Sequence, residues 1–136
     1  NRYATLFYAE LEHDSGQMRC LNAGHNPAFI LRNGSIDCIP ASSYPLGMLP
    51  QVSYEERLVQ LEPGDVLLVY SDGLTEAANP AGEEFGTSRL EAMLPRVRGL
   101  PPSATAERVL GEVDRFLGDA RPTDDLSLVV VVRERS

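Results

Sequence analysis

Apolar and polar residues alternate along the first part of the chain, with the period of two that is typical of β-strands. The alternating segments are residues 3–11, 18–23, 28–31 and 36–39. Turn sequences separate them, and Asn33-Gly34 is a strong hairpin signal. Residues 40–53 are interrupted by prolines, which predicts a loop. The first part of the chain is therefore expected to be a meander of strands.

Two later segments are almost entirely apolar, which is typical of strands that are buried on both faces. Residues 66–70 are apolar at every position and are expected to lie in the middle of a sheet. Residues 126–132 are rich in β-branched side chains and are predicted to form another buried strand. A shorter strand is expected at residues 57–61, before the tight turn Pro63-Gly64-Asp65.

Between these strands the apolar pattern changes to the period of helices. One helix is predicted with Ser88 and Glu91 as a capping box, although Pro95 argues against an uninterrupted helix. A second helix is expected to begin with Ser103 as its cap and to end at Gly118. The apolar stripes are Leu90, Met93, Leu94 and Val97 in the first helix, and Ala106, Val109, Leu110, Val113, Phe116 and Leu117 in the second. Strands, then helices, then a final strand predict an α+β fold with helices packed on an antiparallel sheet.

Composition narrows the class of protein. The chain has 136 residues, enough for one domain with its own core. Its 12 basic residues, all arginine, and 20 acidic residues give a formal charge of −8, which disfavours nucleic acid as a partner. The apolar segments are too short to insert into a membrane. Cys20 and Cys38 are too few for a disulfide framework and favour a cytoplasmic location.

Several chemistries are excluded because the motifs that they need are missing. The histidines and cysteines lack the spacing of a zinc site, and no G-x-S-x-G nucleophile motif is present. A phosphate-binding loop with lysine is excluded because the chain has no lysine. Neither cysteine is followed closely by the arginine that a cysteine phosphatase needs. The acidic side chains remain as the candidates for chemistry.

Two acidic segments adjoin the two buried strands. Asp72 follows the strand at 66–70, and Asp124-Asp125 precedes the strand at 126–132. If these strands pair in antiparallel fashion, Asp72 and Asp124 meet at one edge of the sheet. Clustered carboxylates repel one another, and Mg²⁺ or Mn²⁺ would compensate this charge because these ions prefer oxygen ligands. Two such ions can hold a hydroxide and clamp a phosphoryl group.

Simpler interpretations of the same residues stay open. Ser71-Asp72-Gly73 after a strand is an ordinary turn sequence, and Thr123-Asp124-Asp125 is typical of a solvated turn. A lone histidine such as His25 is more often a packed or solvent-facing residue than a ligand. Each signal alone is weak, and only their joint order and spacing is distinctive.

That joint order resembles a known family. The motifs are Asn22-Ala23-Gly24-His25-Asn26-Pro27, Pro45-Leu46-Gly47, Leu61-Glu62-Pro63-Gly64-Asp65, Tyr70-Ser71-Asp72-Gly73-Leu74-Thr75-Glu76-Ala77, Gly82-Glu83-Glu84-Phe85-Gly86 and Thr123-Asp124-Asp125-Leu126-Ser127-Leu128. As a set they closely resemble the bacterial PPM-type metal-dependent protein serine/threonine phosphatases, in the branch similar to stage II sporulation protein E. The resemblance covers nearly the whole chain. It implies an antiparallel β-sandwich flanked by helices, with two Mn²⁺ or Mg²⁺ ions at one edge.

The resemblance also implies roles for site residues. Asp72 and Asp124 match metal ligands of the family, whose catalyst is a metal-activated hydroxide rather than a side chain. Asp125 and Gly73 would support these ligands from the second position of each motif. Asn22, Gly24 and His25 match a family motif to which the resemblance assigns no chemical role.

The family pattern includes upstream acidic motifs that this sequence lacks. Residues 1–136 are therefore expected to be the C-terminal part of a single phosphatase domain, with the upstream part missing. Two carboxylates cannot fill two metal sites that each need about six oxygens, so this part alone is expected to be inactive and to bind metal weakly. The missing part would leave sheet edges open, which favours a homodimer.

The resemblance implies a function in bacterial signal transduction. The complete enzyme would hydrolyse phosphoserine or phosphothreonine on a partner protein. Phosphorylated anti-sigma-factor antagonists are the expected substrates, and sensor domains are expected to be fused upstream. The alternative is a pseudophosphatase, a non-catalytic binding module. Retention of Asp72 and Asp124 argues against this alternative, because a decayed site has no reason to keep both.

Overall fold

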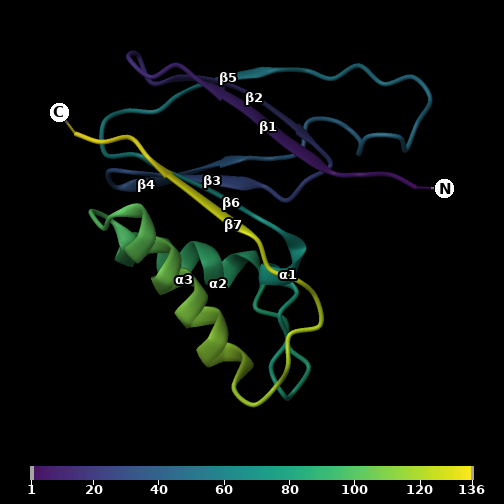
Figure 1. The fold of residues 1–136 in the computed structure, drawn as a ribbon, viewed down its shortest axis with the longest axis vertical. Helices are drawn as coiled ribbons and strands as arrows, with labels where there is room; N and C mark the ends of the chain where they lie inside the picture. The colour runs from purple at the N-terminus through teal and green to yellow at the C-terminus, as the bar shows by residue number, and fades with distance from the viewer. Residues whose placement is uncertain (1, 136) are drawn as a thin grey trace.

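The strands of the chain form two sheets that pack face to face (Figure 1). The computed structural model describes residues 2–135. The first sheet has the order β1-β2-β5, with β1 at Leu6–Leu11, β2 at Gln17–Ala23 and β5 at Arg57–Gln60. The second has the order β4-β3-β6-β7, with β3 at Ala28–Arg32, β4 at Ser35–Ile39, β6 at Val66–Tyr70 and β7 at Leu128–Val132. Neighbouring strands in both sheets are antiparallel, which confirms the predicted α+β class.

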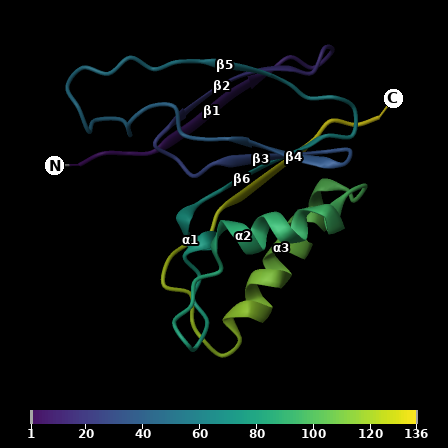
Figure 2. The ribbon, with the colours of Figure 1, turned by 180° about the vertical axis from the view of Figure 1, so that it is seen from behind.

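Helices cover the face of the second sheet that points away from the first (Figure 1, Figure 2). The helical segments are α1 at Asp72–Thr75, α2 at Gly86–Met93, the 3₁₀ helix η1 at Leu94–Val97 and α3 at Pro102–Leu117. The described residues therefore form three layers, in the order sheet, sheet, helices. Within residues 2–135, every helix falls short of the length and apolar character that a membrane span requires.

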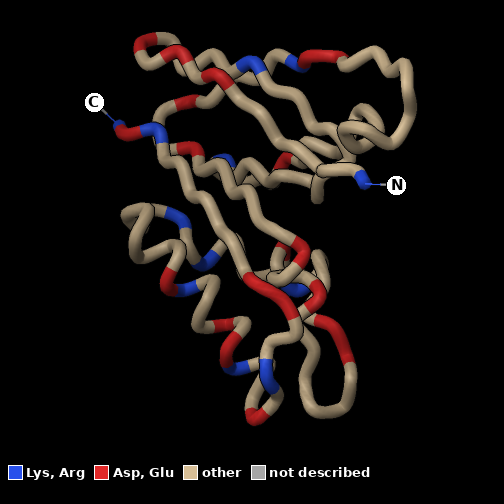
Figure 3. The backbone as a smooth tube through the Cα atoms, turned by 45° about the vertical axis from the view of Figure 1, so that its right-hand side comes forward, with Lys and Arg blue, Asp and Glu red and all other residues tan. Residues whose placement is uncertain are grey.

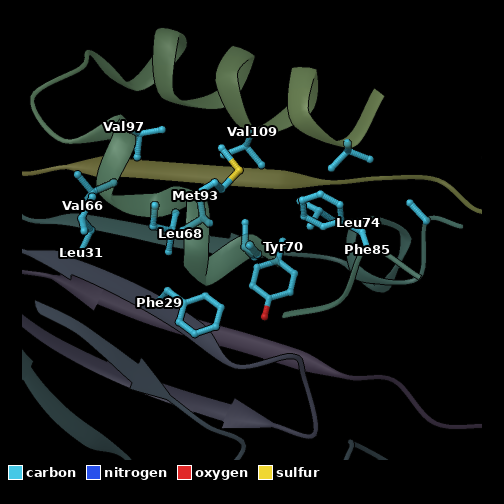
Figure 4. Close-up of a cluster of buried hydrophobic side chains, with 14 of the residues drawn as sticks. Phe29, Leu31, Val66, Leu68, Tyr70, Leu74, Phe85, Met93, Val97 and Val109 are labelled. Atoms are coloured by element: carbon cyan, nitrogen blue, oxygen red, sulfur yellow. The ribbon is translucent and has the colours of Figure 1, made fainter. Parts of the chain in front are cut away.

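The second sheet lies between two hydrophobic cores. One face of β3 and β6 packs against the first sheet through residues such as Ile30 and Leu67. The opposite face packs against the helices through Phe29, Leu68 and Tyr70, as Figure 4 shows. Because successive side chains in a strand point to opposite faces, this arrangement explains why residues 66–70 are apolar throughout. It confirms that this strand lies in the middle of a sheet.

Two predicted helix caps are wrong. α2 begins at Gly86, after Phe85, so Ser88 lies inside the helix and makes no capping hydrogen bond. α3 begins at Pro102 rather than after Ser103. A proline is well suited to the first turn because its φ is already helical and the first turn leaves N–H groups unpaired.

The predicted interruption near Pro95 and the predicted end of the second helix at Gly118 agree with the structure. α2 ends at Met93, and the chain continues through Pro95 as the tighter helix η1, because proline has no N–H to donate to the preceding turn. α3 ends at Leu117 and is capped by Gly118, which has a φ of +57°, a conformation that favours glycine.

The last strand is less buried than the sequence predicts. β7 begins at Leu128 rather than at 126, and it is the outer strand of its sheet, paired only with β6 among the described strands. Val129 is 56% exposed. The apolar run packs against β6 and the helix-side core, and Val131 also packs on the core between the sheets, but the side chains of β7 are at most partly buried.

Tyr70 has a buried hydroxyl whose removal is expected to stabilise the fold. Its ring stacks on Phe29 with centroids 6.0 Å apart, and its Oη has no hydrogen-bond partner among residues 2–135. Burial raises the pKa of this phenol. An unsatisfied buried hydroxyl costs about 1–3 kcal/mol, so Tyr70→Phe is expected to raise the free energy of unfolding by about 1 kcal/mol in urea titrations. Tyr3→Phe, at a 59% exposed position, should change nothing; a loss of stability in Tyr70→Phe would contradict the prediction.

Candidate metal centre

The pairing of β6 with β7 brings the two predicted acidic segments to one edge of the second sheet. Tyr70, at the end of β6, lies opposite Leu128, at the start of β7. Asp72 follows just beyond this pair, and Asp124-Asp125 comes just before it. The antiparallel pairing on which the predicted site depends is therefore present, and it places the two segments side by side.

Hydrogen bonds continue the contact beyond the last strand pair. The N–H of Ser71 donates to the carbonyl oxygen of Ser127 at 2.9 Å, and the N–H of Ser127 donates to Ser71 Oγ at 2.8 Å. Gly73 permits a still closer approach, because a Cβ at this position would lie 2.0 Å from the carbonyl oxygen of Asp125. The structure thus gives Gly73 a steric role, while its support of a metal ligand stays a prediction.

The carboxylates of Asp72, Asp124 and Asp125 are exposed. Asp72 opens the short helix α1, and Asp124 Oδ1 accepts a hydrogen bond from the N–H of Asp125 at 2.8 Å. Figure 3 shows that acidic residues gather around this end of the molecule, near α1 and the segment before β7. The local charge is therefore negative, as the sequence predicts for a site that attracts cations.

The donor chemistry of this edge fits a hard divalent ion, but the number of donors falls short. Carboxylate oxygens are the ligands that Mg²⁺ and Mn²⁺ prefer. Within residues 2–135, however, no three His, Cys, Asp or Glu side chains lie close enough together to hold an ion. The residues described here can supply only part of a coordination sphere, and the ligand roles of Asp72 and Asp124 stay predictions.

A groove of about 390 Å³ adjoins the same edge. Val113 and Leu117 of α3 form an apolar wall, and Asp124, Asp125 and Gly73 border it on the side of the acidic segments. The groove is open to solvent and lies beside the candidate metal ligands.

The motif that begins at Asn22 builds the turn between β2 and β3. Asn22 is 1% exposed, and its Oδ1 accepts the N–H of His25 at 2.8 Å. Its Nδ2 donates to the carbonyl oxygens of Asn26 at 3.1 Å and Ile39 at 3.3 Å. Gly24 has a φ of +67°, and a Cβ there would lie 2.4 Å from Pro45. Both residues therefore shape the turn from the inside, and neither is placed as a ligand.

His25 extends from this turn to the end of β6. Its Nε2 lies 2.9 Å from the carbonyl oxygen of Tyr70, and its Nδ1 lies 3.1 Å from Thr5 Oγ1. Sequence reasoning missed this contact, and it also missed the bonds between Ser71 and Ser127. Pro27 offered one signal for the His25 contact. Proline has no backbone N–H, so a carbonyl group opposite Pro27 on a neighbouring strand needs a donor from elsewhere.

Comparisons with known proteins agree with the predicted family. Residues 1–134 match the family model of stage II sporulation protein E (SpoIIE). Protein IcfG of Synechocystis sp. is 37% identical over 89 residues, which are 65% of this chain and 14% of that protein. The phosphoserine phosphatase RsbU of Bacillus subtilis is 30% identical over 82 residues, 59% of this chain and 24% of that protein.

A solved structure with the same fold is the phosphatase domain of the cell fate determinant SpoIIE from Bacillus subtilis. It superimposes with a TM-score of 0.70 at 25% sequence identity, and the match covers 98% of this chain and 60% of that one. This likeness confirms the predicted phosphatase-like sandwich. Because the family model matches almost every residue, the chain belongs to the stage II sporulation protein E family.

Proposed function

We propose that this chain is part of a metal-dependent phosphatase that hydrolyses phosphoserine or phosphothreonine on a partner protein. The observation that carries the proposal is the convergence of the Asp72 and Asp124 segments at one sheet edge. Membership of the SpoIIE family and the likeness to a phosphatase domain support it. The relative RsbU is named a phosphoserine phosphatase.

In the proposed enzyme, Asp72 and Asp124 would hold Mn²⁺ or Mg²⁺, with Asp125 and Gly73 supporting them. When bound, such ions lower the pKa of water and neutralise charge on a phosphoryl group. One structure of the SpoIIE phosphatase domain from Bacillus subtilis comes from material presoaked with manganese, which supports the choice of ion. Ser71 and Ser127 would position the metal ligands, because the hydrogen bonds between them keep the Asp72 and Asp124 segments side by side.

We propose further that residues 1–136 are the C-terminal part of the phosphatase domain, and that the complete protein supplies the remaining ligands. The support is the shortage of clustered acidic side chains in the described residues. The chain also covers only 60% of the solved phosphatase domain. A cytoplasmic location, fused sensor domains, homodimerisation and a phosphorylated anti-sigma-factor antagonist as substrate belong to the same proposal.

The test is the hydrolysis of a phosphorylated partner protein by the complete protein, with Mn²⁺ and after chelation with EDTA. We expect turnover that requires the ion, whereas residues 1–136 alone should bind Mn²⁺ weakly in calorimetric titrations. Micromolar binding of two ions by residues 1–136 would show that the ligand count is wrong. If the complete protein has no metal-dependent turnover, the proposal fails and the non-catalytic binding module is favoured.

A further inference from the structure

We propose that His25 is a positioning residue for Asp72: it holds the carbonyl group of Tyr70 and thereby fixes the start of the segment that carries Asp72. Asn26 assists in the same contact. The inference rests on the proposed function, because it concerns the metal-binding competence of that edge. It assigns a role to a motif for which the sequence alone offers none.

The carbonyl group of Tyr70, at the end of β6, lacks a backbone hydrogen bond from β3. The register of β3 with β6 pairs Phe29 with Leu68, and its continuation places Pro27 opposite Tyr70. Pro27 has no N–H. The carbonyl of Tyr70 points toward this strand, because the N–H of the same planar peptide unit, that of Ser71, points toward β7. The β3 backbone therefore offers no donor to the carbonyl of Tyr70.

Side chains from the β2–β3 turn take the place of the missing backbone donor. His25 Nε2 lies 2.9 Å from the carbonyl oxygen of Tyr70, and Asn26 Nδ2 lies 3.3 Å from it. Since a carbonyl oxygen only accepts, Nε2 carries the proton. In the neutral ring, Nδ1 accepts from the hydroxyl of Thr5 at 3.1 Å. With both ring nitrogens engaged, His25 is not available as a metal ligand.

The peptide unit between Tyr70 and Ser71 is consequently held on both sides. On one side its carbonyl accepts from His25 and Asn26, and on the other its N–H donates to Ser127 at 2.9 Å. Asp72 is the next residue along the chain. Groups that orient metal ligands without binding the metal typically change metal affinity 10–100-fold when they are removed, by the general behaviour of such outer contacts.

The experiment compares two substitutions of His25 in the complete protein. Glutamine places an amide N–H where histidine has Nε2, whereas asparagine is too short and reaches only the position of Nδ1. We expect His25→Asn to weaken Mn²⁺ binding about tenfold in calorimetric titrations, with a matching rise in the Mn²⁺ concentration that gives half-maximal hydrolysis. We expect His25→Gln to bind Mn²⁺ like the unchanged protein.

Two controls separate positioning from general stability. Val97→Ala opens a cavity at a fully buried residue, which lies near Val66 and at the opposite end of the cluster from Leu74 (Figure 4). It should lower the melting temperature without changing Mn²⁺ affinity. His13→Ala removes an exposed histidine whose side chain contacts only Asp14 among residues 2–135, and it should change neither property.

Three outcomes of these Mn²⁺ titrations would overturn the positioning role of His25. If His25→Asn binds Mn²⁺ as tightly as the unchanged protein, or if His25→Gln is as weak as His25→Asn, the positioning role is overturned while the proposed function stands. A loss of affinity in Val97→Ala equal to that in His25→Asn would also overturn it, because stability alone would then explain the effect. If the unchanged complete protein binds no Mn²⁺, the proposed function fails first, and the inference fails with it.

Discussion

Asp72→Asn and Asp124→Asn are each expected to lower the metal-dependent turnover of the complete protein at least about a hundredfold. A bound divalent ion contributes several kcal/mol to the stabilisation of charge in a phosphoryl transfer, and each 1.36 kcal/mol is about tenfold in rate. Asparagine has nearly the shape of aspartate but lacks the negative charge that holds the ion. Steady-state hydrolysis of a phosphorylated protein at several Mn²⁺ concentrations measures the effect.

The fold should survive both substitutions. Asp72 and Asp124 are exposed, and the asparagine Oδ1 at position 124 can still accept the N–H of Asp125. Surface changes of this kind usually alter stability by less than about 0.5 kcal/mol. Asp14→Asn is the matched control, because its exposed carboxylate lies in the turn before β2 and, within the described part of the chain, contacts only His13. Near-normal turnover in either variant would remove that residue from the ligand set.

Gly73→Ala is expected to separate the two acidic segments. The added Cβ would lie 2.0 Å from the carbonyl oxygen of Asp125 and 3.2 Å from the Cα of Leu126, so backbone must move to admit it. Overpacking of this kind costs about 1–3 kcal/mol, and the displacement carries Asp125 away from Asp72. We expect a lower free energy of unfolding in urea titrations and, in the complete protein, weaker Mn²⁺ binding.

Gly111→Ala provides the matched control for this substitution. Gly111 lies within α3, and apart from the helix's own nearby backbone a Cβ there would meet no heavy atom of the described residues within 4 Å. Alanine favours the helical conformation over glycine by about 1 kcal/mol, so this variant should be more stable and should bind Mn²⁺ normally. Equal stability of Gly73→Ala and the unchanged protein would mean that the two segments are not held as closely as the structure shows.

The order of strands and helices could be predicted from the sequence because hydrophobic periodicity reports which faces are buried. Residues 66–70 are apolar at every position and form the central strand β6. Residues 126–132 look equally buried, yet β7 is an outer strand. An apolar pattern indicates that side chains contact a neighbour, but it does not indicate whether a strand has a partner strand on both edges. The sequence therefore could not distinguish the central strand β6 from the outer strand β7.

The candidate site was predictable only as far as it depends on strand pairing. The apolar patterns predict both strands but not how they pair. The antiparallel pairing of β6 with β7, on which the predicted site depends, brings the Asp72 and Asp124 segments to one edge. The contact of His25 with the carbonyl of Tyr70 could not be predicted in the same way. It depends on the register of β3 with β6. Because both strands are apolar on both faces, their hydrophobic pattern does not select one register.

The turn between β2 and β3 has a mechanical consequence for the molecule. Asn22 lies in β2 of the first sheet and accepts the N–H of His25. His25 and Asn26 in turn contact the carbonyl oxygen of Tyr70 in β6 of the second sheet. The turn therefore ties the two sheets together at the end where Asp72 and Asp124 lie. One sheet cannot shift relative to the other at this end without breaking these hydrogen bonds.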